Sequence, residues 1–209
     1  MFALFADKEH LQHISWCVAA GVPLSWYNLR QLNNPQEWID DDIIHATQSV
    51  LKLQFPEMKG LRSTLNFHIP FGEGKDQEPK SSLKEAVARQ RNDEYGEWEK
   101  WRRTNPPSVR QTQILFVGMN HWVLVTNDHD EMINKVYVYD SLFPHPVPTF
   151  YVEVATIFRF SENEFTIFWP AMANQPNYCD CAVYACAYLT AKCFRLDPAS
   201  VEFVNKVCH

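Results

Sequence analysis

The hydrophobic pattern changes its period along the 209-residue chain, and each period predicts a different kind of element. Between residues 23 and 56, apolar side chains recur every three or four positions, which predicts a turn followed by an amphipathic helix. The positions that carry this period are Ile39, Ile43, Ala46, Val50 and Leu53.

From residue 112 onward the pattern is typical of β-strands. Short runs rich in Val, Ile, Leu and Tyr alternate with polar turn residues. These runs lie within 113–118, 121–127, 135–142 and 164–170. The segment 149–160 fits a helix or a strand. The segment 182–194 contains neither Gly nor Pro and is apolar nearly all round, which predicts a buried helix.

Helices followed by strands and then by helices indicate an α+β fold. The length fits a single domain over 1–209, interrupted by a charged helical insertion over 72–110. This insertion carries Trp98 and Trp101 three residues apart. Two interpretations of it stay open, namely a solvated helix pair packed by the two Trp, and an arm that binds a partner.

Composition narrows the classes of function. Apolar residues make up 46% of the chain, and the net charge of -6 argues against a general affinity for nucleic acid. No apolar run approaches the ~20 residues that cross a bilayer. Asp7 and Glu9 follow the short apolar start, which is unlike a signal peptide. We therefore expect a monomer in the nucleus or cytoplasm that binds neither nucleic acid nor membrane and keeps its cysteines reduced.

The stretch QPNYCDCAVYAC, from Gln175 to Cys186, contains three cysteines and is a candidate functional site. Its cysteines could be disulfide partners, metal ligands, or a nucleophile with bystanders. Structural zinc needs a second matching pair of ligands, which the chain lacks, so we expect no metal. A disulfide between Cys179 and Cys181 would close a very tight loop and would need an oxidising compartment. The nucleophile is therefore favoured.

A thiol nucleophile needs a base, an acid that orients the base, and a donor for the oxyanion. Cys181 lies where the buried helix begins, and the N–H groups of a helix start stabilise a thiolate. His121 begins one predicted strand and Asp140 ends the next, so a hairpin can bring them together. Gln175 precedes Cys181 by six residues and can donate to an oxyanion.

Each of these four residues has a plainer interpretation when taken alone. His121 and Cys181 could be ordinary buried residues, and Asp140 and Gln175 could be polar groups at a strand end and in a loop. The hypothesis depends on the combination, because each residue type falls on an element suited to its role.

Three blocks of sequence resemble the ubiquitin-like-protein proteases, the SUMO-specific type of cysteine peptidase, which is distantly papain-like and related to the adenovirus protease. EWIDDDII, from Glu37 to Ile44, resembles the W-L-x-D-x-x-I entry to a helix of that family. NHWVLVT and VYVYDSL resemble its H-W and Y-D-S-[LM] strands. QPNYCDCAVYA resembles its Q-x-N-x-x-D-C-G block, the most specific of the three.

The resemblance implies a papain-like cysteine protease fold, with a central mixed or antiparallel sheet and the nucleophile at the start of a buried helix. It implies a peptidase without a cofactor. Its expected partner is a ubiquitin-like modifier such as SUMO, or its conjugates, cut after the C-terminal Gly-Gly. The roles carried over are nucleophile for Cys181, base for His121, orienting acid for Asp140 and oxyanion donor for Gln175. Trp38 and Trp122 match the pair that flanks the tunnel for the Gly-Gly tail.

Some positions raise further expectations. Ala182 replaces the usual Gly after the nucleophile, and its methyl could crowd the oxyanion hole unless its φ is negative. Cys179 is a thiol where none is expected. Asp41 should lie in the first turn of its helix, and Asp180 should cap the helix of the nucleophile. Two other functions stay open, namely a viral or mobile-element protease that cleaves Gly-containing polyprotein sites and an inactive protease-like domain that binds a partner.

Overall fold

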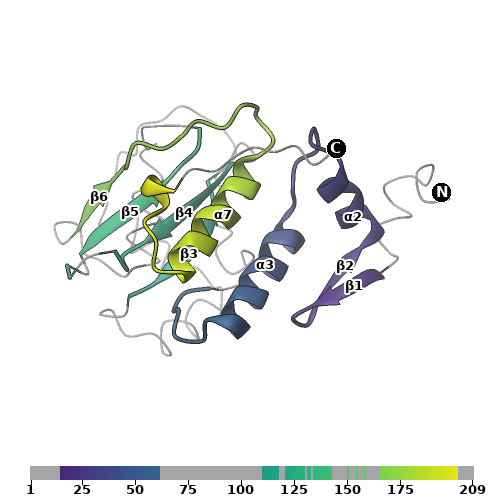
Figure 1. The fold of residues 1–209 in the computed structure, drawn as a ribbon, viewed down its shortest axis with the longest axis horizontal. Helices are drawn as coiled ribbons and strands as arrows, with labels where there is room; N and C mark the ends of the chain where they lie inside the picture. Colours follow the sequence, from purple (N-terminus) through teal and green to yellow (C-terminus); the bar gives the residue numbers. More distant parts are fainter. Residues whose placement is uncertain are drawn as a thin grey trace, which may run out of the picture.

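The computed structural model describes residues 15–61, 110–117, 121–129, 131–132, 134–142 and 165–201, together with Phe150, Val154 and Phe158. The insertion predicted over 72–110 lies outside these residues except for Arg110. Figure 1 shows a mixed sheet crossed by α7 on one side of the molecule and a hairpin with α2 on the other, with α3 between them.

The N-terminal part is a hairpin followed by two helices. Strands β1 (Ser15–Ala19) and β2 (Val22–Ser25) pair antiparallel. The two linking residues, Ala20 and Gly21, have φ of 51° and 85°, as a two-residue hairpin loop requires. Helix α2 (Trp26–Asn33) and helix α3 (Asp41–Gln54) follow. The hydrophobic pattern predicted α3 but not the hairpin or α2.

The buried surface of α3 differs from the predicted stripe. Ile43 and Ala46 are buried against the β1–β2 hairpin, as expected, but Leu53 is 74% exposed. Ile44 and Leu51 are buried instead, in the cluster that contains α7. Helix α3 therefore packs on two sides, and Leu53 faces neither of them.

The four predicted strands form one mixed sheet in the order β3 (Thr112–Phe116), β4 (Trp122–Thr126), β5 (Lys135–Tyr139) and β6 (Thr166–Phe168). The first two pairings are antiparallel and the β5–β6 pairing is parallel. This arrangement confirms the α+β class and the mixed sheet.

Alternate residues of the sheet enter two different cores. Trp122 and Leu124 of β4 pack in the cluster that contains α7, whereas Val123 and Val125 pack in the other. That second cluster also holds Phe150, Val154 and Phe158, which are helical, so the ambiguous segment 149–160 is helical at those positions. Because both of its faces are covered, β4 is buried along its whole length and its sequence is almost continuously apolar.

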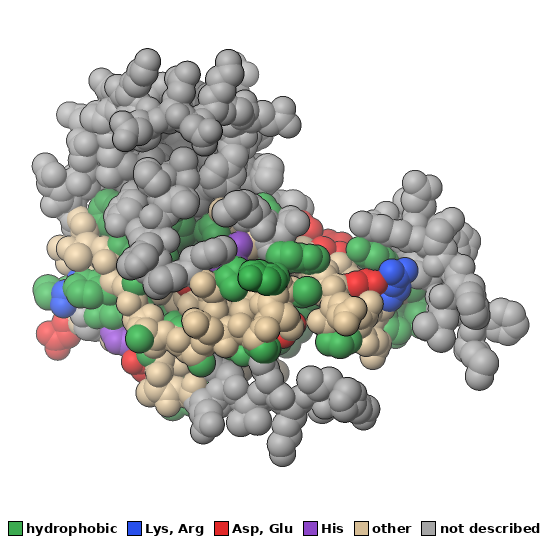
Figure 2. All heavy atoms as spheres, turned by 90° about the horizontal axis from the view of Figure 1, so that it is seen from above, with side chains coloured by type: hydrophobic (Ala, Val, Ile, Leu, Met, Phe, Trp, Pro, Cys, Tyr) green, Lys and Arg blue, Asp and Glu red, His purple; other side chains and the backbone are tan. Residues whose placement is uncertain are grey.

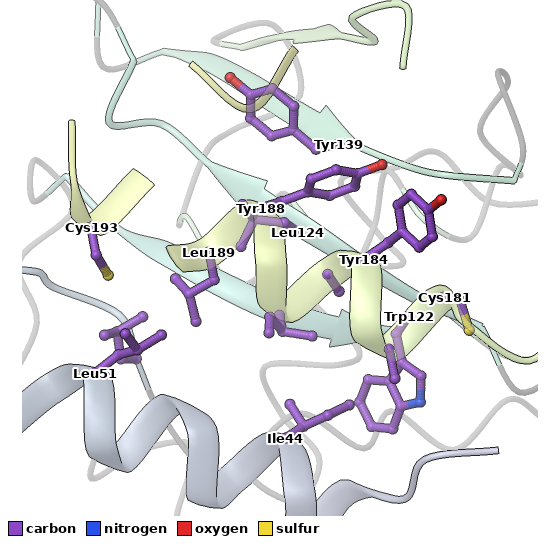
Figure 3. Close-up of a cluster of buried hydrophobic side chains, with 14 of the residues drawn as sticks. Ile44, Leu51, Trp122, Leu124, Tyr139, Cys181, Tyr184, Tyr188, Leu189 and Cys193 are labelled. Atoms are coloured by element: carbon purple, nitrogen blue, oxygen red, sulfur yellow. The ribbon is translucent and has the colours of Figure 1, made fainter. Parts of the chain in front are cut away.

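Helix α7 (Cys181–Cys193) lies at the centre of the fold. It packs on β3 and β4 and against α3 (Figures 1 and 3). A helix enclosed in this way needs apolar residues nearly all round, which confirms the predicted buried helix. None of the helices in the described part of the chain is long and apolar enough to cross a membrane.

The outer edge of β3 is covered by α3 and the segment that follows it. The N–H of Thr112 donates to Lys59 O at 2.8 Å, and the N–H of Ile114 donates to Gln48 Oε1 at 3.4 Å. Gly60 makes this approach possible, because its φ is +104° and an added Cβ would lie 2.4 Å from Thr112 O.

Replacing Gly60 with alanine is therefore expected to lower the free energy of unfolding by about 2–4 kcal/mol, from backbone strain and overpacking together. Urea titration measures this loss. Gly21→Ala is the matched control, because φ there is +85° but nothing lies within 4 Å of the new Cβ. It should cost about 1–2 kcal/mol. Equal losses in the two variants would contradict the role of the Thr112 contact.

Candidate active site

His121 and Asp140 meet at one end of the sheet. The antiparallel register pairs Leu124 with Tyr139, so the start of β4 and the end of β5 share this end. His121 Nε2 lies 2.9 Å from Asp140 Oδ1, and both side chains are almost fully buried. A carboxylate only accepts hydrogen bonds, so Nε2 carries the hydrogen. The N–H of Leu142 donates to the same Oδ1 at 2.8 Å and fixes the carboxylate.

Cys181 is the first residue of α7 and is 1% exposed. Its side chain lies close enough to His121 to raise the pKa of the imidazole. Burial alone would lower the pKa of His121, but hydrogen bonds to Asp140 and Cys181, with their negative charges, raise it to about 9. His121 is therefore protonated at neutral pH.

The loop before Cys181 is organised by the side chain of Asn177. Its Oδ1 accepts from the N–H groups of Cys179 at 2.8 Å and Asp180 at 3.0 Å. Its Nδ2 donates to Asp180 Oδ2 at 2.8 Å. The expectation that Asp180 caps α7 is wrong in one respect, because Asp180 occupies the N-cap position but makes no side-chain cap hydrogen bond. Its carboxylate is turned to Asn177 instead.

Gln175 is buried and held at both ends of its carboxamide. Oε1 accepts from Ser141 Oγ at 2.6 Å, and Nε2 donates to Asn177 O at 2.5 Å. The N–H of Gln175 also donates to Ser141 O at 2.9 Å. The residue predicted to donate to an oxyanion thus bridges the end of β5, next to Asp140, and the loop that leads into Cys181.

The two predicted tunnel residues differ in exposure. Trp122 is buried and lies between the first turn of α7 and Ile44 of α3 (Figure 3). It also packs on Phe116, with ring centroids 4.9 Å apart. Trp38 is 38% exposed and lies in the segment between α2 and α3. Its neighbour Ile39 packs against the core cluster that contains Trp122 and Cys181.

The segment that carries Trp38 is fastened by polar contacts. Gln31 Nε2 donates to Trp38 O at 2.6 Å, and Asn28 Nδ2 donates to both oxygens of Asp40 at 3.0 and 2.9 Å. Burial raises the pKa of Asp40 to about 6. The thiol of Cys179 donates to Gln36 O at 3.4 Å, which joins this segment to the loop of the nucleophile.

The fold is shared with solved protease structures, although no family model and no curated protein matches the chain. The C-terminal protease domain of Ulp1 in complex with Smt3, the yeast ortholog of SUMO, has a TM-score of 0.62 and 15% identity, covering 95% of this chain and 82% of that one. The Ulp1-like SUMO protease catalytic domain of Chaetomium thermophilum has a TM-score of 0.55 and 17% identity, covering 93% and 79%. The chain has the fold of the SUMO proteases.

At 15–17% identity these matches show a shared fold. They confirm, for the fold, the resemblance that the three sequence blocks indicated. A further match is the SUMO protease Ulp1 with its catalytic cysteine oxidised to a sulfinic acid, with a TM-score of 0.59 and 16% identity, covering 87% of this chain and 77% of that one. The catalytic roles of Cys181, His121, Asp140 and Gln175 and the tunnel roles of Trp38 and Trp122 stay predictions.

The SUMO-protease fold accommodates Ala182 in an ordinary backbone. Ala182 lies in the first turn of α7, and the non-glycine residues with positive φ in the described part of the chain are Ala20 and Arg195. Its methyl is 1% exposed and belongs to the core cluster under α7. This placement directs it towards the core.

Sequence reasoning missed the roles of Asn177 and Ser141. Both stand inside the blocks that resemble the SUMO proteases, so the signal was present, but no chemistry had been assigned to them. Asp41 lies in the first turn of α3, as expected. Among the described residues, no disulfide joins Cys17, Cys179, Cys181, Cys186 or Cys193. Among the described residues, no three His, Cys, Asp or Glu side chains gather as a metal site.

Proposed function

We propose that this protein is a thiol protease that hydrolyses peptide or isopeptide bonds after the C-terminal Gly-Gly of a ubiquitin-like modifier. The observation that supports it most is the assembly of Cys181, His121 and Asp140 at the start of α7, within the fold of the SUMO proteases. A nucleophile, a base and an orienting acid in contact are what covalent catalysis requires.

The reaction begins with the proton of Cys181 held on His121, and the thiolate attacks the scissile carbonyl carbon. The carbonyl oxygen becomes an oxyanion that accepts from the N–H of Cys181 and from Nε2 of Gln175. His121 returns the proton to the leaving amine as the C–N bond breaks. A water, deprotonated by His121, then cleaves the thioester and releases the glycine carboxylate.

The two Trp side chains supply the selectivity for glycine. Trp122 provides a buried floor next to Cys181, and Trp38 provides an exposed ring on a segment tied to the loop of the nucleophile. A tail without side chains passes between flat rings, whereas a bulkier tail is excluded. Figure 2 shows apolar side chains in the middle of one face of the molecule, with acidic and His side chains beside them.

The decisive experiment is labelling with modifiers that end in an electrophile. SUMO, ubiquitin and other ubiquitin-like proteins carrying a C-terminal glycine vinyl sulfone are compared with a Gly-Gly peptide vinyl sulfone, and the adduct is mapped by mass spectrometry. We expect one class of folded modifier to label Cys181 far faster than the peptide.

Other outcomes would point elsewhere. Equal labelling by the peptide and by every modifier would favour a protease for Gly-containing polyprotein sites. Tight binding of a modifier without an adduct would favour a binding domain. Labelling at a cysteine other than Cys181 would contradict the assigned nucleophile.

A further inference from the structure

Ser141 follows the orienting acid directly and makes two contacts with the oxyanion donor. It is 1% exposed. Its Oγ donates to Gln175 Oε1 at 2.6 Å, and its backbone oxygen accepts from the N–H of Gln175 at 2.9 Å. Both the backbone and the carboxamide of Gln175 are therefore tied to the end of β5.

The carboxamide of Gln175 must be held in one orientation to be useful. A flip by 180° exchanges its oxygen and its NH₂ group. The flipped group would present an oxygen to the developing oxyanion and would repel it. Asn177 O, which can only accept, lies 2.5 Å from Nε2 and fixes the NH₂ group on its own side. Ser141 Oγ then satisfies the buried Oε1 on the other side.

We propose that Ser141 is a positioning residue that holds the carboxamide of Gln175 with one N–H directed to the oxyanion. Asn177 O uses one of the two N–H bonds of Nε2, which leaves the second for the substrate. Because Asp140 is the preceding residue, the end of β5 positions both the base and the oxyanion donor. This inference rests on the proposed function, since it assigns Ser141 a part in the same reaction.

Ser141→Ala is expected to lower kcat about tenfold, with KM within about twofold of the wild type. The loss is smaller than the ~10²–10³ typical of removing an oxyanion donor, because Gln175 remains but is less often in the productive orientation. In Gln175→Ala, adding Ser141→Ala should cause no further loss, because the group that Ser141 positions is already absent.

Two reagents separate an effect on the oxyanion from an effect on the thiol. A Gly-Gly peptide aldehyde adds to Cys181. The C–S bond forms, and the carbonyl oxygen becomes an oxyanion that receives the thiol proton through His121. Iodoacetamide alkylates the same sulfur with loss of iodide and forms no oxyanion. Ser141→Ala should weaken aldehyde binding about tenfold and leave the rate of alkylation at Cys181 unchanged.

Three further variants complete the test. Ser141→Thr keeps the hydroxyl and should restore aldehyde binding. Ser141→Cys is nearly the size of serine with a weak donor, and replaces the alanine variant if that one does not fold. Thr112→Val removes another buried hydroxyl, which contacts Thr126 at the far end of the sheet, and should leave aldehyde binding unchanged.

The inference is overturned if Ser141→Ala binds the aldehyde as tightly as the wild type, or if Thr112→Val weakens binding equally. A multiplicative loss in the double variant with Gln175→Ala would also overturn it. If Cys181 of the wild type is not alkylated at all, the proposed function fails and this inference fails with it. Normal alkylation with an unaffected aldehyde rejects the role of Ser141 alone.

Discussion

Replacing Cys181 with alanine is expected to lower kcat by on the order of 10⁶, the loss typical of removing the nucleophile of a catalytic triad. Among the described cysteines, we expect only Cys181 to form the acyl intermediate, because the thiol that raises the pKa of His121 is the one at the start of α7. The rate is measured as release of a fluorophore from the modifier that labels the wild type. Modifier binding should persist, since alanine keeps the backbone of the first helical turn.

Cys179→Ala is the matched control two residues away. Its thiol donates to Gln36 O, and the loss of this weak hydrogen bond should change turnover by no more than a few fold. KM should respond more than kcat, because the contact fastens the segment that carries Trp38. If Cys179→Ala is inactive while Cys181→Ala is active, the register of the nucleophile is wrong.

The elements around the candidate site could be predicted because their sequence patterns are local. Strands β4 and β5 and helix α7 are apolar enough to be recognised from the sequence. The approach of His121 and Asp140 was expected because a hairpin joins the ends of neighbouring strands. It is observed as the 2.9 Å contact between Nε2 and Oδ1.

Features that depend on tertiary contacts could not be predicted from the sequence. The exposure of Leu53 follows from the packing of α3 on both the hairpin and α7, which periodicity cannot reveal. The carboxylate of Asp180 was expected to cap α7, but it accepts a hydrogen bond from Asn177 Nδ2 instead. A serine after an aspartate also has no distinctive pattern, and Ser141 acquires its role only when Gln175 folds back onto β5.

These contacts join the predicted residues through the ends of elements. The end of β5 contacts His121 through Asp140 and Gln175 through Ser141. The loop before α7 contacts Gln175 through Asn177 O and the Trp38 segment through Cys179. A change in any one segment should therefore disturb the next, and we expect Asp140, at the end of β5, to have a large effect.

Replacing Asp140 with alanine is expected to lower kcat by about 10⁴. The change removes the acceptor that holds His121 Nε2–H and the Leu142 N–H, so the ring loses both its orientation and its tautomer. It also lowers the pKa of His121, because the hydrogen bond to Asp140 is the largest effect that opposes burial. In the wild type, kcat/KM should fall as pH rises through about 9, where the imidazolium loses its proton. In Asp140→Ala this decrease in kcat/KM should begin at a lower pH.

Asp140→Asn separates orientation from charge. The Leu142 N–H donates to the same Oδ1 that His121 contacts, so it selects the amide oxygen at that position and keeps an acceptor for Nε2. The asparagine variant should therefore lose only about ten- to a hundredfold in kcat, as expected for a charge-assisted hydrogen bond that becomes neutral. The decrease of its kcat/KM at alkaline pH should still shift to lower pH, because the carboxylate charge is gone. Asn and Ala variants with equal losses would mean that the charge of Asp140 outweighs its orienting contact. An alanine variant with the wild-type rate and pH profile would remove Asp140 from the mechanism.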